Sequence, residues 1–255
     1  MAFKFFSQTL IFATALSISA CGSLPARNPI PADLKGSAQI VGMERARYFA
    51  DAPPPFWAEG IAQSREVLMA KFPALFGRNH TYLAVSGGGS DGAFGAGLLK
   101  GWTEHGDRPE FSLVTGISTG ALIAPLAFLG SEYDLALEEI FTDYQTEDLL
   151  EDRMIMNIIF GDSAVKVEKF ARLIARYIDD EVIERIAEEH RRGRRLWIGT
   201  TDLDAARPVL WDVGAIAASG LPGANALIHK VLRASASIPG VFPPVYFDFE
   251  AGGKH

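Results

Sequence analysis

Two consecutive strand–loop–helix units between residues 81 and 129 constrain the fold more than any other feature of this chain. Residues 81–85 form a short apolar run rich in β-formers, and a glycine loop at 86–92 follows it directly. Residues 111–115 form a second such run, which leads into an apolar, alanine-rich helix at 119–129. Strands that alternate with helices predict an α/β fold with a parallel sheet covered by helices.

The helix after the glycine loop should end near Gly106, because glycine commonly follows the last helical turn. Four large apolar side chains of this helix fall on one predicted inward face: Phe94, Leu98, Leu99 and Trp102. Upstream, residues 57–72 could form a helix, and its candidate inward positions are Ile61, Val67, Leu68 and Phe72.

The rest of the chain continues the α/β pattern. Helices are predicted at 134–144, 165–177, 180–192 and 224–232, and strands at 196–201, 208–211 and 245–249. Residues 235–244 are a turn-rich segment. The arginine-rich stretch 188–195 is predicted to be a solvated helix end, with binding of anionic lipid headgroups as the alternative.

A G-x-S-x-G turn joins the second strand to its helix and is the main candidate for chemistry. It consists of Gly116, Ile117, Ser118, Thr119 and Gly120. A nucleophile elbow needs small residues two places before and two places after its serine, because the turn from strand to helix is tight. Ser118 would lie at a helix N-terminus, where the helix dipole stabilises a developing anion. We therefore predict that Ser118 is a nucleophile for acyl transfer.

The glycine loop upstream complements this serine. Glycine lets the backbone turn its N–H groups inward and lets a substrate carbonyl approach closely. The predicted oxyanion hole consists of Gly87, Gly88, Gly89 and Ser90.

The same loop also fits the dinucleotide fingerprint, through Gly87, Gly89 and Gly92. That motif needs an acid at the end of the second strand, but Glu110 precedes the strand. The elbow would have no role in such a site, so nucleotide binding is the weaker alternative.

A histidine base for Ser118 is not evident. His190 lies in the arginine-rich helix, which looks solvent-facing, and His229 lies in an apolar helix, where a packed or boundary position is favoured. His255 is the last residue of the sequence. No histidine therefore stands out as the base of a triad.

Together, these motifs resemble the patatin-like phospholipase family. The resemblance covers roughly residues 81–250 and includes the glycine loop, the elbow, the segment Ala234-Ser235-Ala236-Ser237-Ile238-Pro239 and the segment Phe242-Pro243-Pro244. It implies a three-layer α/β/α sandwich with a mostly parallel central sheet, and a Ser–Asp dyad that hydrolyses acyl esters of lipids without metal or cofactor. It also implies Ser118 as the nucleophile and the backbone of residues 87–90 as the oxyanion hole.

Two departures from the family pattern stand out. Ser86 and Asp91 replace the acid and the basic residue that the family's loop often carries. The dyad aspartate of the family lies in an Asp-Gly-Gly or Asp-Gly-Ala motif, and Asp248, Asp202 and Asp212 do not match it. The sequence predicts that this aspartate lies beyond His255, so that residues 21–255 alone are an inactive fragment. The alternative is a non-catalytic envelope lipoprotein that binds a lipid or a partner.

The N-terminus has the features of a bacterial lipoprotein. Residues 1–20 read as a signal peptide with one basic residue and a short apolar run, and the residues before Cys21 resemble a lipobox. The resemblance implies lipidation of Cys21 and a membrane anchor. Gly22 favours sorting to the outer membrane, facing the periplasm. We predict a tether at 21–37, an N-terminal extension at 38–80 and a patatin-like domain at 81–255, incomplete at its C-terminus.

Bulk composition narrows the remaining classes. The net charge of −7 gives no electrostatic reason to expect nucleic acid as a partner. The five scattered histidines and the one cysteine form no metal-ligand motif. The family resemblance implies a phospholipid or another acyl ester as the substrate, and the sequence carries no signal for an oligomeric state.

Overall fold

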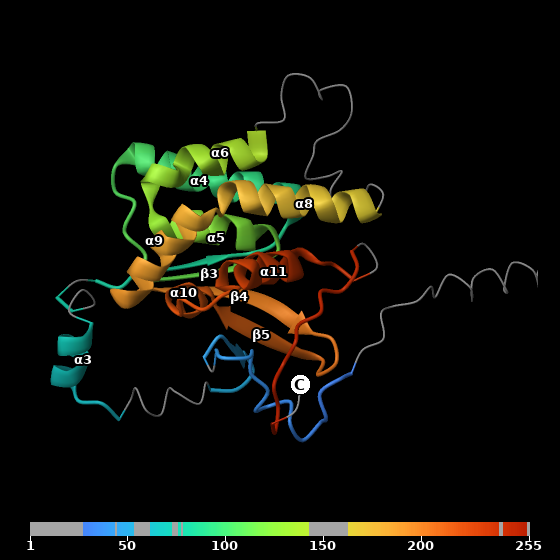
Figure 1. Ribbon diagram of the computed structural model, residues 1–255. Coiled ribbons are helices and arrows are strands. Elements are labelled where there is room, and N and C mark those ends of the chain that lie inside the picture. The colour runs from blue at the N-terminus through green and yellow to red at the C-terminus, as the bar shows by residue number, and fades with distance from the viewer. Residues whose placement is uncertain are drawn as a thin grey trace, which may run out of the picture.

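The sheet of this protein is mixed, with parallel strands on one side and antiparallel pairing on the other. The computed structural model describes residues 28–43, 45–53, 62–72, 76–77, 79–142, 163–239 and 242–253 (Figure 1). The strands are β1 (Arg47–Phe49), β2 (Tyr82–Val85), β3 (Leu113–Ile117), β4 (Arg195–Asp202) and β5 (Arg207–Asp212), in the order β1-β5-β4-β3-β2. Strands β2, β3 and β4 are parallel to one another. Strand β5 pairs antiparallel with β4, and β1 pairs antiparallel with β5. The predicted α/β fold with a mostly parallel sheet core is confirmed.

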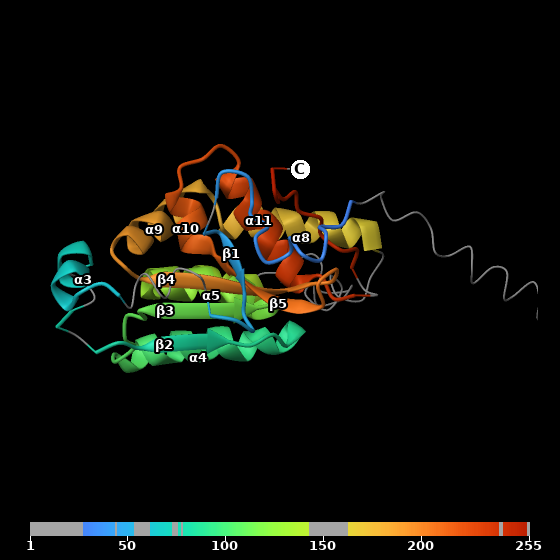
Figure 2. The same cartoon turned by 90° about the horizontal axis from the view of Figure 1, so that it is seen from below.

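Helices connect these strands, and several of them contact the sheet directly. They are α3 (Arg65–Lys71), α4 (Gly92–His105), α5 (Thr119–Leu129), α6 (Asp134–Thr142), α8 (Ser163–Tyr177), α9 (Asp180–Arg191), α10 (Val213–Ala218) and α11 (Ala224–Ala236). Short 3-10 turns occur at η2 (Gly89–Asp91) and η3 (Ser131–Tyr133). The chain passes from β2 to β3 to β4 in one direction, and right-handed crossovers then place their helices on the same face of the sheet. Figures 1 and 2 show α4, α5 and α11 along this face.

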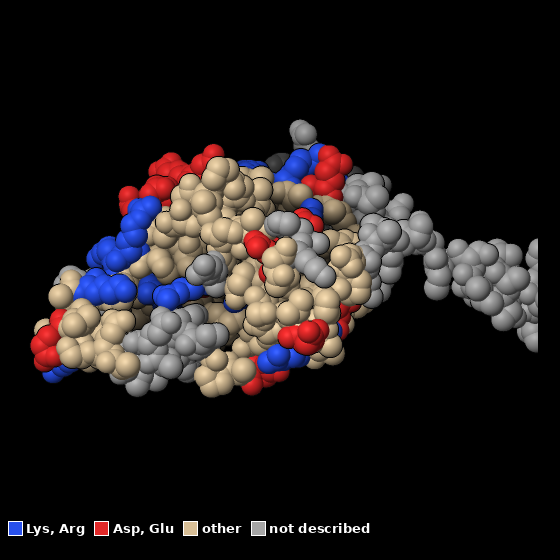
Figure 3. Space-filling model, turned by 60° about the horizontal axis from the view of Figure 1, so that its bottom comes forward, with Lys and Arg blue, Asp and Glu red and all other residues tan. Residues whose placement is uncertain are grey.

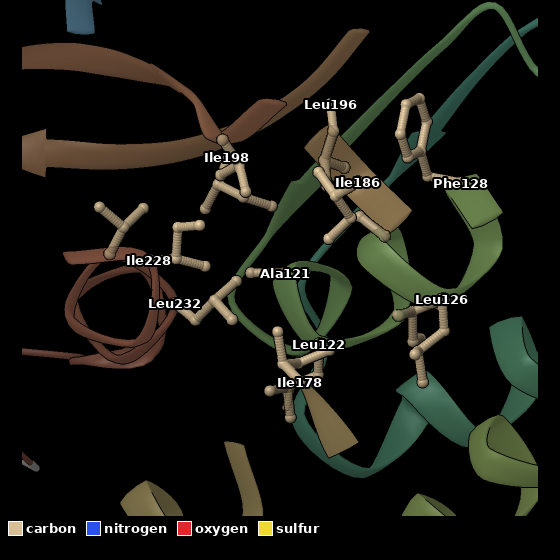
Figure 4. Packing of buried hydrophobic residues seen from close by; sticks show 14 of the residues in the cluster. Ala121, Leu122, Leu126, Phe128, Ile178, Ile186, Leu196, Ile198, Ile228 and Leu232 are labelled. Carbon is tan, nitrogen blue, oxygen red and sulfur yellow. The ribbon is translucent and has the colours of Figure 1, made fainter. Parts of the chain in front are cut away.

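Helix α5 forms the centre of the core. All of its residues except the last, Leu129, are buried, as expected for a helix that is apolar all round. Figure 4 shows Ala121 of α5 close to Ile228 and Leu232 of α11, with Ile198 of β4 above them. The strand that leads into the elbow and the helix that leaves it are thus both held by tight packing.

Several predicted elements agree closely with the structure. Helix α4 ends where expected, because Gly106 adopts a left-handed conformation with φ 91° and its N–H donates to the carbonyl oxygen of Trp102 at 3.2 Å. Helix α5 has the predicted bounds, and α9 begins after Asp179, whose carboxylate accepts the N–H of Val182 at 2.9 Å.

Other predictions were wrong or incomplete. Strand β3 begins two residues later than predicted and continues through Ile117. Helix α11 extends to Ala236, so it includes the first residues of the predicted turn-rich segment. Residues 245–249 form neither a strand nor a bridge, and the isolated bridge that follows them joins Glu250 to Gln39. The sequence patterns also missed the short elements β1 and α10.

The predicted inward face of α4 was partly wrong. Phe94 is 76% exposed and Leu98 is 57% exposed, whereas Leu99 is 4% exposed. The buried residues of α4 are Gly92, Ala96 and Leu99. A Cβ atom on Gly92 would lie 2.2 Å from the Cγ2 of Thr119, so α4 approaches α5 through its small residues. Phe94 and Leu98 are left exposed as a result.

The N-terminal extension differs as well. Helix α3 begins at Arg65 and has no buried residue, and Val67 is exposed. Residues 57–61, which were predicted to start this helix, lie outside the described residues, as do residues 1–20, Cys21, Tyr144 and His255. Among the described helices, none combines the length and the apolarity needed to cross a bilayer.

Figure 3 shows a broad area without charged side chains on the face that it presents, bordered by acidic and basic groups.

Candidate active site

Ser118 lies in a strained turn between β3 and α5. Its φ and ψ are 56° and −122°, and Ala206 is the other non-glycine residue in the described ranges with a positive φ. Such a conformation costs about 1–3 kcal/mol and persists only where the surrounding structure enforces it. Observed strain of this kind points to a functional position.

Glycines on both sides of Ser118 allow this turn. A Cβ atom on Gly116 would lie 2.2 Å from the carbonyl oxygen of Gly120. A Cβ atom on Gly120 would lie 2.3 Å from the carbonyl oxygen of Val85. Both contacts are with backbone atoms, which cannot swing aside as a side chain can. At these two positions, therefore, the elbow has room for no residue larger than glycine.

The glycine loop lies directly beside the elbow. Strands β2 and β3 are parallel neighbours, so the loop after β2 and the turn after β3 meet at one edge of the sheet. A Cβ atom on Gly87 would lie 2.9 Å from the Cβ and 3.5 Å from the Oγ of Ser118. The structure thus brings the predicted oxyanion loop and the predicted nucleophile together.

Thr119 ties the loop to the elbow. Its Oγ1 donates to the carbonyl oxygen of Gly89 at 3.0 Å, and the N–H of Asp91 donates to the carbonyl oxygen of Gly88 at 3.0 Å. Both bonds use carbonyl oxygens of the loop and not its N–H groups. Gly89 has a φ of 58°, which an L-residue rarely adopts, so this turn depends on glycine.

A second serine contacts the elbow, and sequence reasoning assigned it no role. The N–H of Ser118 donates to the Oγ of Ser235 at 2.9 Å, and the Oγ of Ser235 donates to the carbonyl oxygen of Gly199 at 2.6 Å. Ser235 belongs to α11, which contacts both β4 and α5. The signal in the sequence was its place in the segment that resembles the family motif.

Ile117 borders the site on the other side. Its side chain is exposed, and a Cβ atom on Gly199 would lie 2.8 Å from its Cγ1. Gly199 therefore lets β4 pass close to the elbow.

Two of the alternative acids, Asp202 and Asp212, form interactions with groups other than Ser118. The Oδ1 of Asp202 accepts the N–H groups of Asp204 and Ala205 at 3.0 and 2.9 Å, and its Oδ2 lies 3.7 Å from Arg47. Asp212 accepts the N–H of Ala215 at 2.8 Å, and burial raises the pKa of its carboxyl. Asp212 of β5 lies opposite Trp197 of β4 in the sheet. Trp197 comes two residues before Gly199, where the β3–β4 ladder ends beside the elbow.

His190 was predicted to face solvent, but it does not. Its side chain lies mostly buried against α10, with its Nδ1 3.5 Å from Asp212, and a Cβ atom on Gly214 would lie 2.6 Å from that nitrogen. Burial, with the charges of Arg195 and Arg191, lowers the pKa of His190 to about 4. His229 is packed as expected, with its Nε2 2.6 Å from the carbonyl oxygen of Ile178.

The arginine-rich stretch is only partly solvated. Arg191 and Arg192 are exposed, but Arg194 is buried and donates to the carbonyl oxygens of Phe111 and Phe128. The prediction of a solvated helix end was therefore wrong for Arg194, because this side chain joins β4 to the core.

The dinucleotide alternative has no support in the geometry. Glu110 precedes β3 and lies 3.7 Å from the Nε of Arg194, which precedes β4. The glycine loop follows the opposite, carboxyl end of β2. The acid and the loop are therefore at opposite edges of the sheet.

A mixed α/β sheet with a G-x-S-x-G turn between strand and helix, facing a glycine loop, defines the class of α/β proteins built like serine hydrolases. The sequence model of one family, described as patatin-like phospholipase, matches residues 83–253. The chain therefore belongs to the patatin-like phospholipase family, a family of lipid acyl hydrolases. No curated protein matches the chain.

Proposed function

We propose that this protein is a serine acyl hydrolase of lipids in which Ser118 is the nucleophile and an aspartate is its base. The observation that carries the proposal is the strained backbone of Ser118, which faces Gly87 across the edge of the sheet. A strained nucleophile beside a glycine loop is the arrangement that acyl transfer needs. The family match supports a lipid ester as the substrate.

The proposed reaction has two steps. The Oγ of Ser118 attacks the ester carbonyl carbon while its proton passes to the aspartate, and the carbonyl oxygen becomes an oxyanion. Backbone N–H groups of residues 87–90 would donate to this oxyanion. The alcohol leaves with the proton, and an acyl-serine remains. Water then attacks the acyl-serine, which releases the fatty acid and restores the Ser118 hydroxyl.

Labelling of Ser118 tests this assignment. The purified full-length protein, which includes the dyad aspartate, should carry the label on Ser118 after treatment with a fluorophosphonate and should hydrolyse short-chain nitrophenyl esters. Ser118→Ala should abolish both signals, whereas Ser37→Ala, which removes an exposed hydroxyl bonded to Leu34, should keep both. Equal ester hydrolysis by wild type and Ser118→Ala would refute the proposal. An unlabelled protein that still binds lipid vesicles would favour a non-catalytic lipid-binding role.

We also propose that Cys21 is lipidated and holds the protein at the bacterial outer membrane, facing the periplasm. The lipobox-like residues before Cys21 support this anchor, and more than one acyl chain is needed for stable attachment. Mass spectrometry of the N-terminal peptide and membrane fractionation test it. Cys21→Ser should move the protein from the membrane fraction to the soluble fraction, and an unchanged distribution would refute the anchor.

A further inference from the structure

We propose that Ser235 is a positioning residue that holds the backbone of Ser118 in its strained conformation by bridging the Ser118 N–H and the Gly199 carbonyl. The inference rests on the proposed function, because it takes Ser118 as the nucleophile. Ser235 lies 117 residues from Ser118 in the sequence, and α11 brings it to the elbow.

The position of Ser235 at the end of a strand pairing explains why a bridge is needed. The β3–β4 ladder ends with the pair Ile117 and Gly199, so Ser118 is the first residue that the sheet does not hold. Its φ of 56° is also unfavourable for serine. The chain could relax at this point unless another group fixes the Ser118 N–H.

The hydroxyl of Ser235 suits this position because it accepts one hydrogen bond and donates another. It accepts from the Ser118 N–H at 2.9 Å and donates to the Gly199 carbonyl oxygen at 2.6 Å. A hydroxyl is the smallest side-chain group that can do both. Alanine at this position would remove the hydrogen bond that each of these two groups makes to Ser235, and the loss of such part-buried hydrogen bonds is unfavourable.

Packing of α11 fixes where this hydroxyl lies. Ile228, Val231 and Leu232 of α11 are fully buried, and the helix contacts β4 and α5. Ser235 follows in the last turn of the same helix. The elbow is therefore held from its own strand, from its own helix and from a third element.

This bridge also limits what the two groups can do in catalysis. The Ser118 N–H is engaged by Ser235, so this N–H is not available to the oxyanion. The Ser235 proton is directed to Gly199, so Ser235 is not the base. Loss of Ser235 should therefore lower kcat and the rate of Ser118 labelling, with little change in KM or in the shape of the pH profile.

Three variants of the full-length protein test the role of Ser235 by the rate of fluorophosphonate labelling at Ser118 and by kcat and KM for a nitrophenyl ester. Ser235→Ala should slow labelling by roughly 10- to 100-fold, as misplacement of a reactive group does. Ser235→Thr keeps the hydroxyl and should recover most of the rate. Ser237→Ala is the matched control, because the Oγ of Ser237 donates to Arg233 within the same segment, and its rate should stay near wild type.

Hydrogen exchange of the peptide that contains residues 113–120 gives a readout without catalysis. Ser235→Ala should speed exchange of the elbow amide, and Ser237→Ala should not. Equal labelling and equal exchange in wild type and Ser235→Ala would overturn the inference. A wild type without label on Ser118 would instead refute the proposed function, and the exchange of the elbow peptide would then decide the role of Ser235.

Discussion

Atoms around Ser118 approach so closely that single added methyl groups should have large effects. Gly116 is the clearest case, since its added Cβ would meet both the Gly120 carbonyl oxygen at 2.2 Å and the Ala124 Cβ at 2.7 Å. The two obstacles belong to α5, which is buried over almost its whole length. Neither the helix nor the strand can move without disturbing the core.

Gly116→Ala should therefore lower the free energy of unfolding by at least about 1–3 kcal/mol, the usual cost of overpacking. Gly97→Ala is the control, because Gly97 lies in α4 with no atom within 4 Å of an added Cβ. This substitution should raise the free energy of unfolding by about 0.5–1 kcal/mol. Urea denaturation measures both, and equal midpoints for Gly116→Ala and wild type would contradict the described packing.

At the level of elements, substitutions in α4 test whether the burial of a side chain or its place in the sequence pattern decides its contribution to the free energy of unfolding. Leu99→Ala should lower the free energy of unfolding by about 2–5 kcal/mol, because Leu99 is buried. Phe94→Ala should change it by less than about 0.5 kcal/mol, as is usual for surface positions. Chemical denaturation of the two variants measures the difference. A larger loss for Phe94→Ala than for Leu99→Ala would restore the face predicted from the sequence.

A buried ion pair connects α6 to the loop before β3. Arg108 donates to Asp134 at 2.5 Å and to the Oγ1 of Thr103 at 3.1 Å, and both partners of the ion pair are nearly inaccessible to solvent. Asp134→Ala leaves the arginine buried without its carboxylate, which should cost about 3–5 kcal/mol of unfolding free energy.

The exposed pair Arg172 and Glu168 within α8 supplies the control for this substitution. Glu168→Ala should change the free energy of unfolding by less than about 1 kcal/mol, because solvent screens such pairs. Thermal or urea unfolding of the two alanine variants measures the contrast. Similar losses in both would show that Arg108 does not depend on Asp134.

Sequence patterns predicted the elements whose signals are local. The length of α5 follows from an apolar run that is buried all round, and the end of α4 follows from Gly106. Strand β1 has only three residues, and its hydrogen bonds are to β5. The residues of β1 alone therefore carry no pattern that would predict a strand. The inward face of α4 depends on the close approach of Gly92 to Thr119, which a periodicity count cannot include.

The candidate site shows the same division. The elbow and the glycine loop are each contiguous motifs, so the sequence alone predicts that both belong to the same site. The contact of Ser235 with Ser118 depends on the packing of α11 against β4, so no spacing along the chain predicts it. The burial of His190 depends on the missed helix α10 in the same way.

For the whole molecule, His190 should make stability depend on pH. Its pKa is about 4 in the folded state because of burial, against 6.5 for an ordinary histidine. Between these values the unfolded chain binds a proton that the folded protein does not, so stability falls as pH falls from 6.5 to 4. The loss is at most roughly 3 kcal/mol, at 1.36 kcal/mol per pKa unit.

Comparison with His190→Gln isolates this effect. Burial raises the pKa of Asp212, which acts in the opposite sense, because stability from this group is lost as pH rises through its folded-state pKa. The free energy of unfolding should fall more in wild type than in His190→Gln between pH 7 and pH 4.5. Parallel losses in the two proteins would show that His190 does not titrate as its burial implies.

The pairing of β1 with β5 also has a consequence for the order of folding. Arg207 binds Asp51 across 156 residues of chain, and β1 lies at the edge of the sheet. Closing so long a loop is slow compared with forming the β2–α4–β3 unit, whose partners are neighbours in the sequence. Strand β1 should therefore join a sheet that already exists. Asp51→Ala should then speed unfolding and leave the folding rate nearly unchanged.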